Sequence, residues 1–225
     1  MTQTPAPGQN LDFQCECGAI RGVLRRASLR ASSRQGRRLV CHCKDCQVFA
    51  HYLGREKQML DDNAGTPIYQ TDACRFDITG GRERIACVSL TDKSMLRWYC
   101  GDCRTPVANS SASNRFGSLG LILTGFDTGK TNALLGTDTA HVATRSGAGD
   151  MSKVKKAGIT GIAAMLWDIA VRAIKAQFNP ELRKSPLFDT KTGEPVAAPV
   201  KVTRAQRLAL DEKADIYRDV LAELR

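Results

Sequence analysis

Apolar and polar residues alternate along several short stretches in the first 130 residues of the chain. Leu11, Phe13 and Cys15 occupy every second position, which is the period of a strand with one buried face. Residues 19–24 then predict the antiparallel partner of this strand in a hairpin. Further short strands are predicted at residues 39–41, 68–70, 74–78, 85–90, 96–99 and 117–126. With turn-forming residues between them, as in the loop at 61–65, the pattern is typical of a mainly β protein.

The pattern changes after residue 150, where the apolar positions take the period of a helix. Residues 158–178 contain no proline and carry a wide apolar arc, which predicts a helix that needs cover on more than one side. We expect it to dock on the β domain, with a homo-oligomer interface or a membrane surface as the alternatives. Residues 179–202 hold four prolines and predict an extended linker. Thr203, with Gln206 three residues later, predicts a capping box that opens a last helix.

The chain therefore divides into three predicted parts: residues 1–10 as a disordered lead-in, 11–150 as a β domain, and 151–225 as a C-terminal helical extension with a Pro-rich linker. Apolar residues make up 42% and charged residues 25% of the 225 positions, which excludes an intrinsically disordered chain. No uncharged stretch reaches the roughly 18 residues of a membrane span. Residues 1–10 also lack the basic and apolar regions of a secretory signal, so no membrane partner is expected.

Nine cysteines add candidate chemistry to this picture. The number is odd and no export signal is found, so a disulfide framework is disfavoured and a reducing, cytoplasmic location is expected. Seven of the nine form three tight groups: Cys15 and Cys17; Cys41, Cys43 and Cys46; Cys100 and Cys103. Spacings of two and three residues bring thiolates within reach of one tetrahedral ion. The remaining two, Cys74 and Cys87, are predicted to be small buried apolar residues in strands.

Seven thiolates divide most naturally into one set of four and one of three. A Cys₄ zinc site is closed and structural, whereas a three-ligand site leaves one position open for water or substrate. The group with three cysteines is the obvious open site, and the other two groups then pair to make the closed one. This predicts two Zn²⁺ ions per chain. A thioredoxin-like role for Cys100 and Cys103 is the alternative, but it leaves the other two groups without a role.

The ordered C-x-C, C-x-C-x-x-C and C-x-x-C motifs within residues 11–127 resemble the glutathione-dependent formaldehyde-activating enzyme family, to which the centromere protein V domain is related. The resemblance implies a β-rich, tent-like fold with two zinc ions. It assigns Cys15, Cys17, Cys100 and Cys103 to the structural ion, and Cys41, Cys43 and Cys46 to the substrate-side ion. It also implies a carbon–sulfur lyase that acts on a thiol–aldehyde adduct such as S-hydroxymethylglutathione. Gln47 stands where the family usually has arginine.

Other residues near the middle motif are weaker candidates. His51 is the candidate fourth ligand of the three-cysteine site. Asp45 is the nearest carboxylate, although the sequence identifies no general base. In an extended strand, His42 faces away from its two cysteine neighbours and is expected to support the site or to be exposed. His141 lies in a Gly/Thr-rich region and is expected to be exposed.

Residues 25–38 contain six arginines and no acidic residue, and they predict a solvated loop. The alternative is an anion-binding loop for phosphate or for the carboxylates of glutathione. The net charge of +10 also permits a second class of function, a non-catalytic zinc scaffold that binds an acidic protein or a nucleic acid. No aromatic residue is interleaved with these arginines, which disfavours base stacking. From the cysteine motifs and the resemblance they carry, the leading prediction is a cytoplasmic zinc enzyme whose partner is glutathione or another small thiol.

Overall fold

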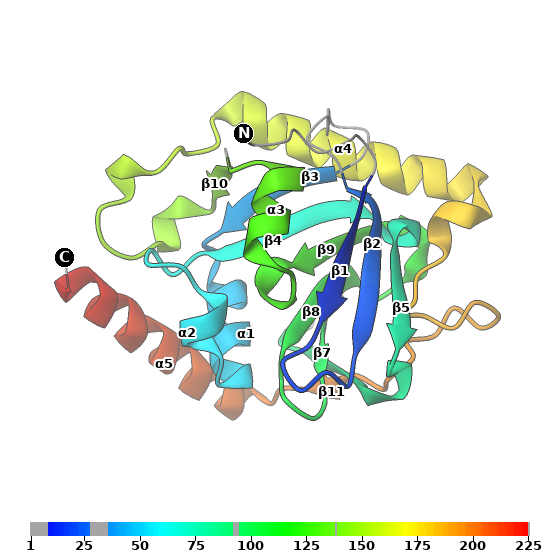
Figure 1. Ribbon diagram of the computed structural model, residues 1–225. Helices are drawn as coiled ribbons and strands as arrows, with labels where there is room; N and C mark the ends of the chain where they lie inside the picture. Colours follow the sequence, from blue (N-terminus) through cyan, green and yellow to red (C-terminus); the bar gives the residue numbers. More distant parts are fainter. Residues whose placement is uncertain (1–8, 28–35, 92–94, 138, 225) are drawn as a thin grey trace.

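The computed structural model describes residues 9–27, 36–91, 95–137 and 139–224, which form two β-sheets surrounded by helices (Figure 1). The smaller sheet is antiparallel, in the order β1 (Gln9–Gln14), β2 (Arg21–Ala27), β5 (Phe76–Gly80). The larger sheet has the order β10 (Ala140–Val142), β3 (Gly36–Cys41), β4 (Thr66–Asp72), β9 (Ser118–Ile122), β8 (Pro106–Ser111), β7 (Met95–Cys100), β6 (Ile85–Ser89), β11 (Val200–Lys201). Its strands are antiparallel except at the two edges, where β10 and β11 pair in parallel with β3 and β6.

The main core lies between the two sheets. Leu11 and Phe13 of β1 are buried and their neighbours along the strand are exposed, as the alternating pattern predicted. The Phe13 ring packs edge-on against Phe126, with 5.2 Å between ring centroids. Trp98 of β7 is also fully buried, and its indole N–H donates to the Ser110 hydroxyl at 2.8 Å. This bond lets a large aromatic side chain enter the core without leaving a polar group unpaired.

The helices lie at the periphery of the larger sheet (Figure 1). The α-helices are α1 (Lys44–Leu53), α2 (Glu56–Met59), α3 (Thr128–Leu135), α4 (Ile159–Phe178) and α5 (Arg204–Glu223). Short 3₁₀ turns are η1 (Ala73–Arg75), η2 (Arg82–Arg84), η3 (Asn114–Phe116), η4 (Leu123–Gly125), η5 (Thr144–Ser146), η6 (Met151–Lys153) and η7 (Pro180–Arg183). The C-terminal α5 packs on α1, burying Ala214, and Lys44 of α1 forms an ion pair with Asp215 at 3.0 Å. The last helix therefore supports the helix that begins within the middle cysteine motif.

Helix α4 matches its predicted position, but the direction of its apolar residues differs from the prediction. Ile159, Trp167 and Phe178 are 89%, 69% and 86% exposed. The side chains turned toward the sheet include two charged ones: Arg172 pairs with Asp72, and Asp168 pairs with Arg37 at 2.8 Å. Tertiary ion pairs thus set the rotation of the helix, and most of the predicted apolar arc faces outward. No helix among the residues described here is long and apolar enough to cross a membrane.

The predicted β-rich domain with a C-terminal helical extension is confirmed, and so is the capping box of Thr203 and Gln206. Of the predicted lead-in, residues 1–8 lie outside the described residues, while residues 9 and 10 already belong to β1. Two further predictions were wrong. The predicted strand at 74–78 begins as the turn η1, which contains Cys74. The 179–202 segment is not a simple linker, because it contains η7 and the edge strand β11.

Candidate metal centres

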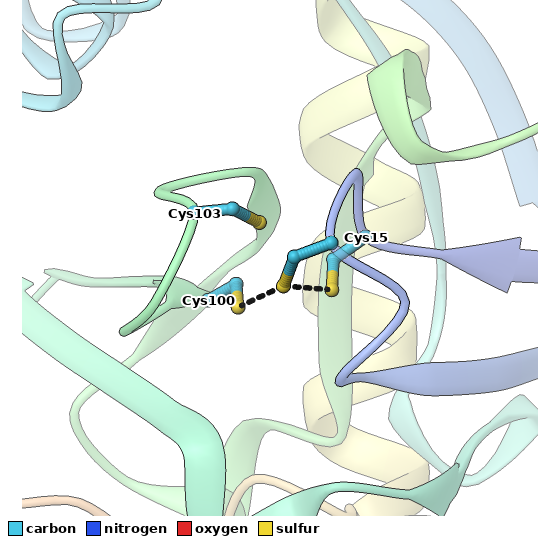
Figure 2. Close-up of side chains that lie close together, drawn as sticks. Cys15, Cys100 and Cys103 are labelled. Carbon is cyan, nitrogen blue, oxygen red and sulfur yellow. Dashed lines mark hydrogen bonds between the residues drawn. The ribbon is translucent and has the colours of Figure 1, made fainter.

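The first and last cysteine groups lie at two tight turns that face each other (Figure 2). Cys15 follows β1, and its carbonyl accepts a hydrogen bond from the Gly18 N–H at 2.9 Å; Gly18 has a φ of +75°. Cys100 ends β7, and its carbonyl accepts from the Arg104 N–H at 2.9 Å; Arg104 has a φ of +61°. Each turn folds back on its own first cysteine. The thiols of the two turns meet in the space between them (Figure 2).

The thiol separations in this group fit one tetrahedral ion. The sulfur atoms of Cys15 and Cys17 lie 3.5 Å apart, and those of Cys17 and Cys100 lie 3.8 Å apart. With the sulfur atom of Cys103 they form a group of four, all within 4.8 Å of one another. Two ligands of a tetrahedral zinc at about 2.3 Å would be separated by about 3.8 Å. The four thiols can therefore hold a zinc ion. Cys100 and Cys103 have two further thiols beside them, which disfavours the alternative of a thioredoxin-like redox pair.

Burial raises the pKa of Cys15 and Cys100, whereas hydrogen bonds favour the thiolate of Cys103, the form that binds metal. The Ile20 N–H donates to the Cys15 sulfur at 3.1 Å. Thr105 contacts the Cys103 sulfur at 3.1 Å and also accepts from the Glu16 N–H, which links the two turns. Burial alone would raise the pKa of Cys103, but the hydrogen bonds, led by that of Thr105, lower it to about 6.

The middle group lies where β3 leads into α1. Cys41 is the last residue of β3, Cys43 is the N-cap of α1, and Cys46 is in its first turn. The three sulfur atoms lie within 4.8 Å of one another. The Cys43 side chain makes no capping hydrogen bond. The helix N-terminus favours negative charge in its first turn, and this suits a cluster of thiolates.

Arg97 of β7 is the side chain at this group that the sequence analysis missed. It is 5% exposed, and its Nη1 donates to the Cys46 sulfur at 3.6 Å and to Asn109 Oδ1 at 3.1 Å. Its guanidinium also lies 5.6 Å from the ring centroid of Phe49. Hydrogen bonds from the other two thiols, and then the charge of Arg97, hold the pKa of Cys46 well below its usual range. An arginine within the apolar run of residues 96–99 was the only sequence signal.

A cavity of about 460 Å³ opens beside the three thiols. It is lined by Cys41, Cys43, Cys46, Arg97, Leu39, Ile68, Gln70, Met95, Asn109, Ser110, Ser111, Phe116, Ser118, Gly120, Val142, Met165 and Ile169. The larger sheet supplies one wall and α4 supplies another, through Met165 and Ile169. The three-thiol group therefore borders a space of the size that small-molecule sites have, about 300–1,000 Å³.

A family model described as a family of unknown function (DUF6151) matches residues 8–199. The chain belongs to this family. No curated protein matches it. A crystal structure of a Rhodobacter sphaeroides protein is similar at 16% sequence identity and a TM-score of 0.35, over 52% of this chain and 89% of the other. The resemblance to the formaldehyde-activating enzymes rests on the cysteine motifs.

The structure of this DUF6151 chain does not bring His51 or Asp45 to the three thiols. Among the described residues, no further histidine or carboxylate atom joins the group within 4.8 Å. The His51 ring packs against Tyr217 at 5.3 Å, with its Nδ1 3.9 Å from Glu56. Asp45 forms an ion pair with Arg207 of α5 at 2.7 Å. His51 is therefore held away from the cluster by α2 and α5, and Asp45 has a structural partner.

Gln47 has a structural role in the DUF6151 chain. It is 1% exposed, and its Nε2 donates to the carbonyl of His42 at 2.9 Å and to the carbonyl of Ser146 at 2.7 Å. The His42 carbonyl lies between Cys41 and Cys43 in the chain. Gln47 thus ties the cysteine loop to the segment around η5. The sequence could not reveal this bond because 99 residues separate its two ends.

His42 and His141 form a hydrogen-bonded pair in which His141 is half-buried, which corrects the expectation that His141 is exposed. His42 is fully buried; its Nδ1 lies 2.9 Å from the carbonyl of Asn63, and its Nε2 lies 2.8 Å from His141 Nδ1. Because a carbonyl only accepts, His42 carries its proton on Nδ1 and accepts from His141. Asp61 completes a third group with ligand atoms within 4.8 Å. Two nitrogen ligands of a tetrahedral zinc lie about 3.3 Å apart, so 2.8 Å indicates a hydrogen bond rather than shared metal.

The two ends of the Arg-rich segment are strands, which the prediction of a loop did not anticipate. Arg25 belongs to β2 and pairs with Asp77, and Arg37 and Arg38 belong to β3. Arg37 pairs with Asp168, and Arg38 donates to Asn132 Oδ1 at 2.8 Å. Residues 28–35 of the segment lie outside the described residues. Arg25, Arg37 and Arg38 are therefore strand residues with partners inside the chain, which weakens the anion-binding alternative for these three.

Proposed function

We propose that the DUF6151 chain is a zinc protein in which the three-thiol group is a reaction site of the carbon–sulfur lyase type. Its substrate would be a thiol–aldehyde adduct, and the motif resemblance implies glutathione and formaldehyde as the components. The observation that carries the proposal is the position of Cys41, Cys43 and Cys46 at a cavity of about 460 Å³, with no fourth histidine, cysteine or carboxylate ligand among the described residues. Three ligands and a cavity are what an open zinc site requires.

The four-thiol group fits the other role. Cys15, Cys17, Cys100 and Cys103 would complete a tetrahedron and leave no position for a substrate. They join the end of β1 to the end of β7, residues far apart in sequence that belong to different sheets. We infer that an ion bound there stabilises the fold by holding the two sheets together.

The reaction needs only a proton and an electron pair to be redistributed. In an adduct R–S–CH₂–OH, the carbon–sulfur bond breaks with its electron pair kept on sulfur, and the hydroxyl loses its proton to water as the carbonyl forms. No oxidant or reductant is required. A zinc ion bound by the three thiols would lower the pKa of the departing thiol, so that sulfur leaves as a thiolate.

Asn109 is placed to orient the adduct. Asn109 lines the cavity, and because its Oδ1 accepts from Arg97, its amide N–H groups can donate to the adduct oxygen. Ser110 also lines the cavity, but its hydroxyl accepts from Trp98 and donates to the carbonyl of Ser111 at 2.9 Å. Asn109 is therefore the better positioned donor. Arg97 fixes both Asn109 and Cys46, and it adds positive charge beside the thiolates.

The test is substitution of Co²⁺ for zinc in the full chain, followed by addition of thiols. A thiol that enters the open position should add a sulfur-to-cobalt charge-transfer band, and the band should be lost in Cys43→Ser. The matched control is Cys103→Ser, which should lose metal from the other group and keep the thiol-dependent band if the protein stays folded. If the wild type binds two metal ions but no thiol changes its spectrum, the proposed reaction site is wrong.

Aldehyde release provides the second half of the test. S-hydroxymethyl adducts of thiols, added to the zinc-loaded protein, should release formaldehyde faster than in buffer. Asn109→Asp removes the amide donor and retains an oxygen for Arg97, so it should slow release by about ten-fold or more, the scale of one lost donor to a reacting oxygen. Unchanged release in Asn109→Asp would remove this residue from the mechanism.

A further inference from the structure

We propose that the cavity selects an uncharged, apolar thiol, in place of a highly charged one such as glutathione. The inference rests on the proposed function, because it concerns the group attached to the sulfur that would enter the three-thiol site. Its basis is independent of the cysteines: it comes from the charges and the surfaces that line the rest of the cavity.

The cavity offers few partners for a charged ligand. Apart from the three thiols, Arg97 is the only ionisable side chain among the described residues that line it. This guanidinium is 5% exposed and already donates to Asn109 and Cys46. Glutathione carries two carboxylates and one ammonium group, and burying a charge without a partner is costly. The lining provides no carboxylate for the ammonium and no second cation for the carboxylates.

Two arginines on the strand that leads to Cys41 are also engaged. Arg37, on the strand that leads to Cys41, donates to Asp168 at 2.8 Å. Asp168 precedes the cavity residue Ile169 on α4, so this ion pair neutralises charge beside the α4 wall. The arginine beside it, Arg38, is turned to Asn132. Binding glutathione carboxylates with these side chains would require breaking existing interactions.

Apolar side chains make up facing walls of the cavity. Leu39 and Ile68 come from β3 and β4, and Met165 and Ile169 come from α4. Met165 packs against Leu39, Cys46 and Ile68 in one apolar cluster. Methionine adapts its shape to irregular ligands. A hydrocarbon or aromatic group attached to the sulfur would therefore be held between α4 and the sheet, with the sulfur directed toward the cysteines.

The test compares three thiols on the full chain with Co²⁺ in its metal sites: benzyl mercaptan, 2-mercaptoethanesulfonate and glutathione. We expect the Kd of benzyl mercaptan, measured from the charge-transfer band, to be at least ten-fold lower than that of either charged thiol. Met165→Lys should raise the Kd for benzyl mercaptan about ten-fold or more. Ile174→Lys is the matched control, because Ile174 lies on the same helix, is 57% exposed and does not line the cavity.

The possible failures are distinguishable. Tighter or equal binding of glutathione would overturn the inference about the substrate and leave the proposed reaction site intact. Equal effects of Met165→Lys and Ile174→Lys would overturn the role of the α4 wall. If none of the three thiols alters the spectrum of a protein that holds two Co²⁺ ions, the proposed function itself fails. The comparison of thiols on the wild type does not depend on whether the Met165 variant folds.

Discussion

Arg172 of α4 and Asp72 at the end of β4 form an ion pair whose side chains are only 8% and 20% exposed. The pair attaches the helix to the larger sheet on the side where α4 forms a wall of the cavity. A buried ion pair is not by itself strongly stabilising, but removal of one partner leaves a charge unpaired at low exposure. Arg172 therefore determines which face of α4 is turned inward.

Replacing this arginine should be costly. We expect Arg172→Met to lower the free energy of unfolding by about 3 kcal/mol, because Asp72 would lose its partner. Urea denaturation followed by circular dichroism measures this change. Lys175→Met, an exposed substitution on the same helix, is the control and should stay within about 0.5 kcal/mol of the wild type. Equal midpoints for the two variants would show that the ion pair does not hold the helix.

The outward face of α4 should tolerate change in the isolated chain. Trp167 and Leu166 are 69% and 56% exposed, so their substitution by serine removes little buried surface. We expect the melting temperature of the double variant to stay within about 2 °C of the wild type. Ala176, which is fully buried against Gly117, gives the contrast: Ala176→Leu should overpack the contact and cost about 1–3 kcal/mol. A large loss of stability in the Trp167 and Leu166 variant would show that this face is covered in solution.

Much of the fold could be predicted from local patterns. Alternation at Leu11 and Phe13 predicted β1, and the capping box of Thr203 predicted the start of α5. Strand β8, however, has three apolar residues followed by three polar ones, so it shows no alternation, and its place between β7 and β9 comes from long-range pairing. Helix α1 was missed because its N-cap is Cys43, and cysteine is not one of the residue types that signal the start of a helix.

The candidate sites also combine features that local spacing predicts with features that depend on the tertiary fold. The cysteine groups could be predicted because each group spans at most six residues, and spacing alone places the thiols together. Arg97 could not be assigned, because it reaches Cys46 only through the order of strands in the larger sheet. The His42–His141 pair likewise depends on β10 lying beside β3, a parallel pairing that no short-range pattern indicates. The rotation of α4 was mispredicted because ion pairs with Asp72 and Arg37 outweigh its apolar arc.

The two cysteine groups should differ in their contribution to stability. Cys100→Ser should lose about one zinc ion and lower the melting temperature by roughly 10 °C, because binding energy at a structural site is folding energy. Cys43→Ser should also lose about one ion, but with a smaller change in melting temperature, since its group borders a cavity. Elemental analysis and calorimetry on the same samples test both points. If both variants melt alike, the division into structural and reaction sites is wrong.

His51 should make stability depend on pH. Burial lowers the pKa of His51 below its usual value, although Glu56 partly opposes this, and the His51 Nε2 is buried without a hydrogen-bond partner. As pH falls through the usual histidine pKa of about 6.5, the unfolded chain takes up the proton more readily than the folded chain. Stability contributed by neutral His51 is therefore present above that pH and lost below it. We expect His51→Gln to reduce the slope of unfolding free energy between about pH 6.5 and 5, measured with urea at constant ionic strength. Because acid also releases zinc, the comparison is made between variants of equal metal content, and an unchanged slope would show that His51 is not held neutral by its burial.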